Sequence, residues 1–325
     1  LPDNFFWGGS VTSFQTEGAA YEDGKGLSMY DLHKRENGEP KWDHGIDFYH
    51  RYKEDIAMME ELGLNFYRFS LCWARIQPDG ETKINEKGIA YYNNVIDELL
   101  AHGITPMITL DHYDIPLPLK EKYNGFFSRR VVNAFEKFTE ICVKAFGDRV
   151  KYWMTFNEIN FLRSWTQIGI HNNDKQSKYQ AVHHLFVASA KAVELGHSIN
   201  PDFQIGMMVA YIPSYPLSCK PEDVMAAVQF NREQEFYMDV QAKGYYPAHK
   251  LKEFEREGMT IQMESEDLAI IQKGTVDYIG FSYYMSTVST AYPEEVKYVG
   301  GNQMPAVKNP YLQESEWGWA VDPLG

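Results

Sequence analysis

Segments rich in β-branched and aromatic residues alternate with segments of helical periodicity along the whole chain. The strand-like segments span residues 5–12, 66–73, 105–113, 150–158, 203–213 and 276–287. Between them, apolar residues recur every three or four positions, as Phe135, Phe138 and Cys142 do within 131–146. The same periodicity predicts helices over 52–62, 90–102, 179–195 and 222–243, with Pro221 opening the last one.

This alternation predicts parallel strands joined by right-handed crossovers. Two architectures fit: an open doubly wound sheet and a closed (β/α)₈ barrel. An open sheet of this class normally carries a Gly-rich nucleotide-binding turn after its first strand. No such turn follows 5–12, and 18–26 lacks the spacing of a P-loop. We therefore predict an α/β fold of the (β/α)₈ TIM-barrel class, a single domain over 1–325 with about six of the eight strands present.

Composition narrows the range of partners. The chain has 325 residues, 44% of them apolar, and a formal net charge of −14, which argues against nucleic acid and anionic membranes as partners. No apolar run of 18 residues occurs, and the first nine residues do not resemble a signal peptide. Three widely spaced cysteines fit a reducing compartment. We expect a cytoplasmic protein, and its oligomeric state is left open.

Polar residues at the predicted strand ends are the candidates for chemistry, because barrel sites form at the carboxyl ends of strands. Glu158 ends the fourth strand, and a carboxyl group in a partly desolvated pocket can act as a general acid. The alternative for Glu158 is a structural salt bridge or a helix cap. Arg68 lies within the second strand, where a buried guanidinium needs an anion. That anion is Glu158 or a carboxylate outside the sequence.

No motif indicates a metal ion or another cofactor. His183 and His184 are adjacent on a predicted helix and therefore point in different directions. What remains is carboxylate chemistry in a pocket of polar and aromatic side chains, which suits a carbohydrate substrate.

Several short motifs resemble those of glycoside hydrolase family 1, in the order in which that family carries them. They are FFWGG at 5–9, QTEG at 15–18, YRFSLCWARI at 67–76, HYDIP at 112–116, TFNE at 155–158, HH at 183–184, SYY at 282–284 and GW at 318–319. The family fold is a (β/α)₈ barrel, in agreement with the alternation described above.

The resemblance implies a role for seven residues. Glu158 matches the catalytic acid/base, and Asn157 matches its neighbour that bonds the sugar 2-hydroxyl. Arg68 and Tyr284 match the pair that orients the nucleophilic carboxylate. Gln15 and His112 match positions that hold hydroxyls of the sugar being released, and Trp319 matches an aromatic residue beside the aglycone. These seven assignments rest on the matching motifs.

Within the family, three positions look closest to the 6-phospho-β-glucosidase branch: Tyr113, Ile159 and Ser282. The resemblance then implies a retaining hydrolase that releases glucose 6-phosphate from phosphorylated β-disaccharides or aryl glucosides. The alternatives are an unphosphorylated β-glucosidase, a 6-phospho-β-galactosidase, or a sugar-binding protein without catalysis. The family's nucleophile motif, of the Thr-Glu-Asn-Gly type, does not occur in the sequence, so we expect an N-terminal portion of a longer chain. Glu17 and Asp111 are candidates to replace this nucleophile, by their position in the sequence only.

Overall fold

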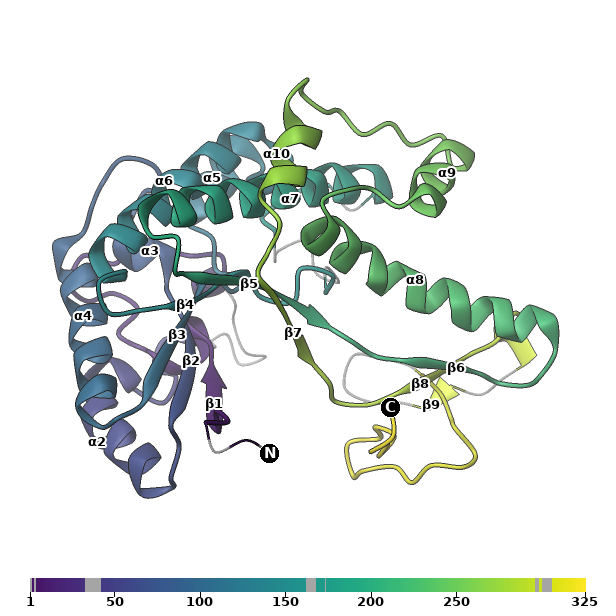
Figure 1. Ribbon diagram of the computed structural model, residues 1–325, viewed down its shortest axis with the longest axis horizontal. Helices are drawn as coiled ribbons and strands as arrows, with labels where there is room; N and C mark the ends of the chain where they lie inside the picture. The colour runs from purple at the N-terminus through teal and green to yellow at the C-terminus, as the bar shows by residue number, and fades with distance from the viewer. Residues whose placement is uncertain are drawn as a thin grey trace.

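Six parallel strands form one curled sheet at the centre of the computed structural model (Figure 1). The structure describes residues 2, 4–32, 42–161, 168–172, 174–295, 298–299 and 306–325. The strand order is β1-β2-β3-β4-β5-β7. These strands are β1 (Gly8–Val11), β2 (Phe66–Ser70), β3 (Thr105–Asp111), β4 (Tyr152–Phe156), β5 (Gln204–Ala210) and β7 (Tyr278–Ser282). All six predicted strands are therefore confirmed, with the predicted parallel pairing.

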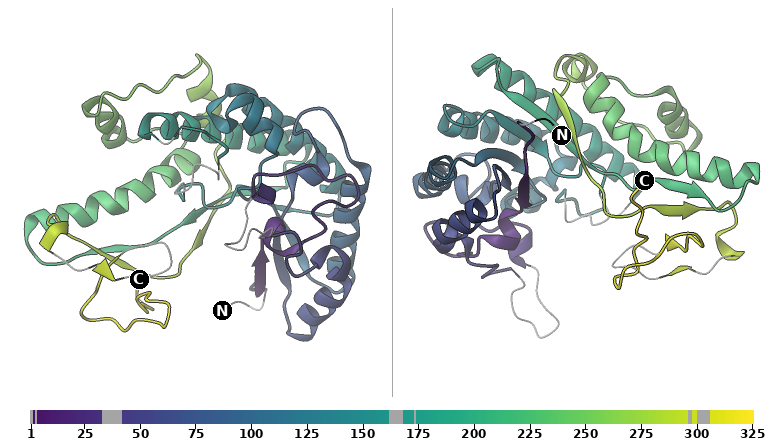
Figure 2. Two further views of the ribbon diagram at one scale, coloured as in Figure 1. Left: turned by 180° about the vertical axis from the view of Figure 1, so that it is seen from behind. Right: turned by 60° about the horizontal axis from the view of Figure 1, so that its bottom comes forward.

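Helices connect successive strands and cover the outer face of the sheet (Figures 1 and 2). The five predicted helices are confirmed as α2 (Phe48–Glu61), α4 (Glu86–Ala101), α6 (Arg129–Phe146), α7 (Lys175–Ile199) and α8 (Pro221–Lys243). Pro221 begins α8, where its missing N–H group costs nothing. Shorter helices lie in the connections: α1 (Ser13–Thr16), α3 (Trp73–Ile76), α5 (Leu117–Tyr123), α9 (Ala248–Arg256) and α10 (Asp267–Lys273).

The last predicted strand, 276–287, is divided in the structure. Its first part is β7, after which the chain leaves the central sheet. Its final residue begins β8 (Thr287–Ser289), which pairs in parallel with β6 (Ser214–Pro216) alongside α8. A second small pair, β9 (Tyr298–Val299) and β10 (Ala306–Val307), is antiparallel. One continuous apolar run thus supplies two strands, because the β5–α8 connection offers it a second partner.

The central sheet is open between β1 and β7, each of which has one neighbour in the strand order. Phe281 on β7 is 64% exposed, and Trp7 beside β1 is 58% exposed. The described strands thus form a curled part of a barrel with helices outside it, which confirms the TIM-barrel class.

The main core lies between the outer face of the sheet and the helices. Trp73 stacks on Phe138 of α6, and Phe135 of α6 stacks on Phe156 of β4. Burying a side chain of this size contributes about 1.5–3 kcal/mol. The inner face is different: it carries Arg68 and a small apolar cluster that contains Met107, Met154 and Met208.

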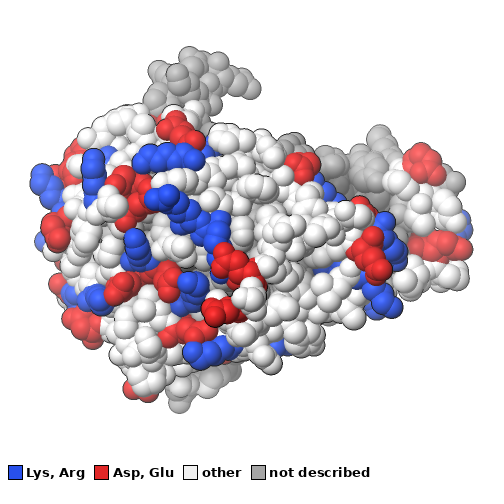
Figure 3. All heavy atoms as spheres, turned by 90° about the horizontal axis from the view of Figure 1, so that it is seen from above, with Lys and Arg blue, Asp and Glu red and all other residues white. Residues whose placement is uncertain are grey.

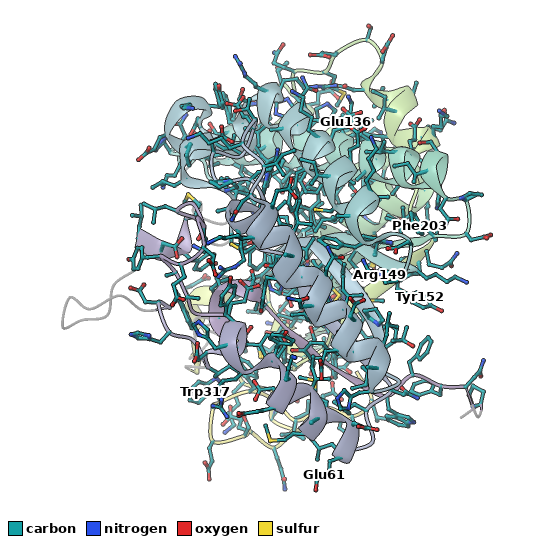
Figure 4. All side chains as sticks on the ribbon, turned by 90° about the vertical axis from the view of Figure 1, so that its left-hand side faces the viewer. Glu61, Glu136, Arg149, Tyr152, Phe203 and Trp317 are labelled. Carbon is teal, nitrogen blue, oxygen red and sulfur yellow. The ribbon has the colours of Figure 1, made fainter. Side chains whose placement is uncertain are left out.

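Charged side chains are spread over the outside. On the face seen from above, basic and acidic groups are interspersed (Figure 3). Arg149, between α6 and β4, donates to Asp97 of α4 at 2.5 Å and also binds Asn93, which ties neighbouring helices together (Figure 4). Among the described residues, no helix is both long and apolar enough to cross a membrane.

Candidate active site

The turn after β4 positions Asn157 and Glu158 through backbone hydrogen bonds to both neighbouring strands. The Asn157 N–H donates to the Asp111 carbonyl on β3 at 3.0 Å. The Ile159 N–H donates to the Met208 carbonyl on β5, also at 3.0 Å. Glu158 lies between these two anchors, so its Cα position is fixed by the sheet itself.

The Glu158 carboxylate is held by a tyrosine from the end of the neighbouring strand. The Tyr113 hydroxyl lies 3.2 Å from Glu158 Oε2 and 3.2 Å from its carbonyl oxygen. Burial, the charge of Glu158 and their hydrogen bond raise the pKa of Tyr113 well above its usual value, so this hydroxyl is the donor. Both residues have a positive φ, 71° for Tyr113 and 37° for Glu158. Strain of this kind costs about 1–3 kcal/mol per residue and concentrates at functional sites.

Arg68 links β2 to β1, to β3 and to the turn after β4 through its guanidinium group. Nε donates to Thr109 Oγ1 at 2.8 Å, Nη2 donates to Asn157 Oδ1 at 2.6 Å, and Nη1 lies 3.4 Å from Ser10 Oγ. No carboxylate in the described part of the chain forms an ion pair with it, so a salt bridge to Glu158 is not the explanation for this arginine. Burial lowers the pKa of Arg68, and the nearby charge of Glu158 acts in the opposite direction.

A cavity of about 470 Å³ opens at the carboxyl ends of the strands and brings most of the predicted residues together. Its lining includes Gln15, Arg68, His112, Asn157, Glu158 and Tyr284. Among the described lining residues, Glu158 is the one carboxylate and Arg68 the one cation. Trp319 does not line this cavity, but its ring lies 5.6 Å from that of Tyr284, and both border an adjoining pocket of about 320 Å³.

The two predicted hydroxyl-binding residues differ in their surroundings. Gln15 is exposed at the rim. His112 is half-buried, with its ring edge-on to Phe14 and Tyr113. Burial and the charge of Arg68 lower the pKa of His112 well below its usual value. A neutral imidazole can both donate to and accept from a sugar hydroxyl.

Glu17 and Asp111, the two candidates to replace the nucleophile, are not among the described lining residues of the cavity. The Arg75 guanidinium donates from Nε to Glu17 Oε2 at 2.9 Å, and the Tyr92 hydroxyl donates to Glu17 Oε1 at 2.5 Å. Asp111 is 4% exposed, and burial together with the charge of Asp114 raises its pKa well above the usual value. Glu17 therefore belongs to a buried ion pair, and Asp111 is buried and is not among the described lining residues of the cavity.

The two adjacent histidines point in different directions, as predicted. His183 bonds Tyr246 and Asp267, whereas His184 bonds the Phe126 carbonyl. Within the described ranges, no group of three or more His, Cys, Asp or Glu residues could hold a metal ion. One contact of the site was not anticipated, that of Tyr113 with Glu158. The register of β3 and β4 could have predicted this contact, because Tyr113 and Glu158 each follow the end of their strand by two positions.

Comparison with known proteins places this geometry in a family. The profile described as glycosyl hydrolase family 1 matches residues 1–325. An aryl-phospho-β-D-glucosidase, BglA, of Bacillus subtilis (strain 168) is 47% identical over 357 residues, covering 100% of this chain and 74% of its own length. The chain belongs to glycosyl hydrolase family 1. Members of this family are retaining glycosidases that work with two carboxylates. Among the described lining residues of the cavity, Glu158 is the one carboxylate available for such a role.

Further family members agree in sequence and in structure. The 6-phospho-β-glucosidase AscB of Escherichia coli (strain K12) is 41% identical, covering 100% of this chain and 74% of its own length. A family 1 β-glucosidase structure from Thermotoga maritima has a TM-score of 0.85 at 31% identity, with 99% of this chain and 72% of that chain covered. The chain thus spans about three quarters of the length of these family 1 relatives.

Proposed function

We propose that this family 1 member hydrolyses 6-phospho-β-D-glucosides, either phosphorylated β-disaccharides or aryl glucosides, to glucose 6-phosphate and an aglycone. The observation that carries the proposal is the cavity at the strand ends, where Glu158 stands among polar and aromatic side chains of sugar-binding chemistry. The relatives at 41–47% identity whose printed names specify phospho-β-glucosidases support the phosphorylated substrate. The lining residues Tyr113 and Ser282 agree with that branch.

In this mechanism Glu158 acts twice. As a general acid it gives its proton to the glycosidic oxygen while a second carboxylate attacks the anomeric carbon, so the aglycone leaves and a glycosyl ester forms. As a general base it then takes a proton from the water that attacks the same carbon, which releases the sugar with its original configuration. In retaining enzymes the two carboxyl groups are about 5–5.5 Å apart.

Arg68 and Tyr284 supply the other side of the site. The guanidinium group of Arg68 is almost completely buried and has hydrogen bonds to neutral groups only, within the described residues. A buried cation of this kind is costly without an anion. We infer that Arg68, with Tyr284 beside it in the same cavity, orients the nucleophilic carboxylate, which the family carries in a part of its length not represented here. Trp319 would then flank the aglycone.

We infer a single catalytic domain. We also infer a cytoplasmic location, which is supported by three free cysteines, two of them buried. A small carbohydrate is the partner. Nucleic acid is not, because the net charge is −14 and basic side chains are interspersed with acidic ones on the face in Figure 3.

The acid role of Glu158 is tested by the variant Glu158→Gln in the full-length protein. We expect kcat/KM for a disaccharide substrate to fall by about 10²–10⁴-fold, the usual contribution of general acid catalysis, because a poor leaving group needs the proton. Aryl substrates with activated leaving groups should keep their kcat/KM. The matched control Glu61→Gln changes an exposed residue at the end of α2, visible in Figure 4, and should leave both values unchanged. Equal losses on both kinds of substrate, with folding intact, would contradict the acid role.

A further inference from the structure

Tyr113 is brought to Glu158 by the register of the sheet. Strands β3 and β4 pair in parallel with Asp111 opposite Phe156. Tyr113 and Glu158 each lie two residues beyond this pair, at the ends of the two neighbouring strands. In both residues the backbone turns into the left-handed region at this point, with φ of 71° and 37°. Neither residue is a glycine, so the fold maintains two strained residues side by side at the carboxyl ends of its strands.

The two strained residues are joined by the contact of the Tyr113 hydroxyl with Glu158. The Tyr113 hydroxyl oxygen lies 3.2 Å from Glu158 Oε2 and 3.2 Å from the Glu158 carbonyl oxygen, so it contacts both the side chain and the backbone of Glu158. The Tyr113 ring is buried and lies edge-on to His112, with 5.2 Å between ring centres. A ring fixed in this way leaves its hydroxyl little freedom to follow a moving carboxylate. The contact therefore limits rotation of the Glu158 side chain.

We propose that Tyr113 is a positioning residue for the acid/base Glu158, and that it occupies Oε2 so that Oε1 is the oxygen that exchanges the proton with the glycosidic oxygen and with water. When Glu158 is protonated, a donor at Oε2 favours the proton on Oε1, from which it passes to the glycosidic oxygen. When Glu158 is ionised, the same donor stabilises its charge. No proton leaves Tyr113 in either step. This inference rests on the proposed glycosidase function.

The test compares Tyr113→Phe with the full-length wild-type protein over a series of 6-phosphoglucosides whose leaving groups range from dinitrophenol to an alcohol. Removing one hydrogen bond to a charged group should lower kcat/KM on the order of tenfold for the alcohol and leave it unchanged for dinitrophenol. The competitive inhibition constant of glucose 6-phosphate should not change, because Asn157, the proposed sugar contact beside Tyr113, is still held by Arg68.

Tyr246→Phe is the matched control. Tyr246 is also buried, and its hydroxyl bonds His183 Nδ1 at 2.9 Å, outside the cavity lining. It should give the same kcat/KM as the wild type across the series. A uniform loss of kcat/KM in Tyr113→Phe would overturn the positioning role, as would a weaker inhibition by glucose 6-phosphate, which would make Tyr113 a sugar contact instead.

Failure of this inference is distinguishable from failure of the proposed function. If Glu158→Gln shows the expected dependence on the leaving group and Tyr113→Phe does not, only the role of Tyr113 is refuted. If the wild-type protein hydrolyses none of the phosphoglucosides, the proposed function is refuted, and the role of Tyr113 with it.

Discussion

Neutralising Glu17 should destabilise the fold strongly, because Glu17 is the counter-ion of a buried arginine. The Arg75 side chain is 1% exposed and that of Glu17 is 6% exposed, with 2.9 Å between Nε and Oε2. Burial opposes ionisation of Arg75, and the charge of Glu17 nevertheless raises the pKa of Arg75. In Glu17→Gln the guanidinium remains charged and buried, with the Gly18 carbonyl and the Tyr49 ring still in contact. Removing one partner of a buried pair costs about 3–5 kcal/mol.

The free energy of unfolding, measured by urea titration, gives the loss directly. Glu22→Gln is the control, because Glu22 is 54% exposed and pairs with His50 at the surface, where such pairs contribute at most about 1 kcal/mol. The double variant Glu17→Met/Arg75→Met should lose less than the sum of its single changes, since no uncompensated charge remains. A loss below about 1 kcal/mol in Glu17→Gln would show that Arg75 does not need Glu17 as its counter-ion.

Two further predictions concern buried charge. In the full-length protein, Arg68→Met should lower hydrolysis by more than about 100-fold, because the nucleophilic carboxylate loses the cation proposed to orient it, and should lower the free energy of unfolding by about 1–3 kcal/mol, because Asn157 Oδ1 loses its donor; unchanged hydrolysis would contradict this. Burial and the charge of Glu17 raise the pKa of Asp114 to about 7, although Ser13 donates to it at 2.7 Å. In the unfolded chain the pKa of an Asp carboxyl is about 3.9, so between this value and the pKa in the folded state the folded protein binds more protons. The folded protein therefore loses stability as pH rises from about 4 to 7. Asp114→Asn should remove that part of the decline, and equal slopes in both proteins in urea titrations at several pH values would contradict it.

The sequence predicts the elements of this fold well, because a barrel strand and its covering helix each leave a periodic signal. The division of 276–287 between β7 and β8 could not be predicted, since it depends on β6, about 70 residues away. Motif resemblance, more than periodicity, located the site residues, six of which line one cavity.

The contacts of individual site residues needed the three-dimensional structure. The partners of Arg68 come from β1, β3 and the turn after β4, and their identity depends on the register of the pairs. The sequence does not show that Glu17 belongs to an ion pair, because its partner Arg75 is 58 positions away. The positive φ of Glu158 could not be predicted from the type of residue either, because positions with a positive φ usually hold glycine.

Hydrolysis of phosphorylated β-glucosides is tested by comparing one substrate with and without its phosphate. The full-length protein, with its mass checked, is assayed in parallel on a nitrophenyl β-glucoside and on the 6-phosphate of the same glucoside. We expect kcat/KM to be higher for the phosphorylated substrate by at least about 100-fold, the contribution of two charge-assisted hydrogen bonds to the phosphate. A preference for the unphosphorylated glucoside would refute the proposed substrate, and it would show that Tyr113, Ile159 and Ser282 do not indicate a phosphorylated substrate.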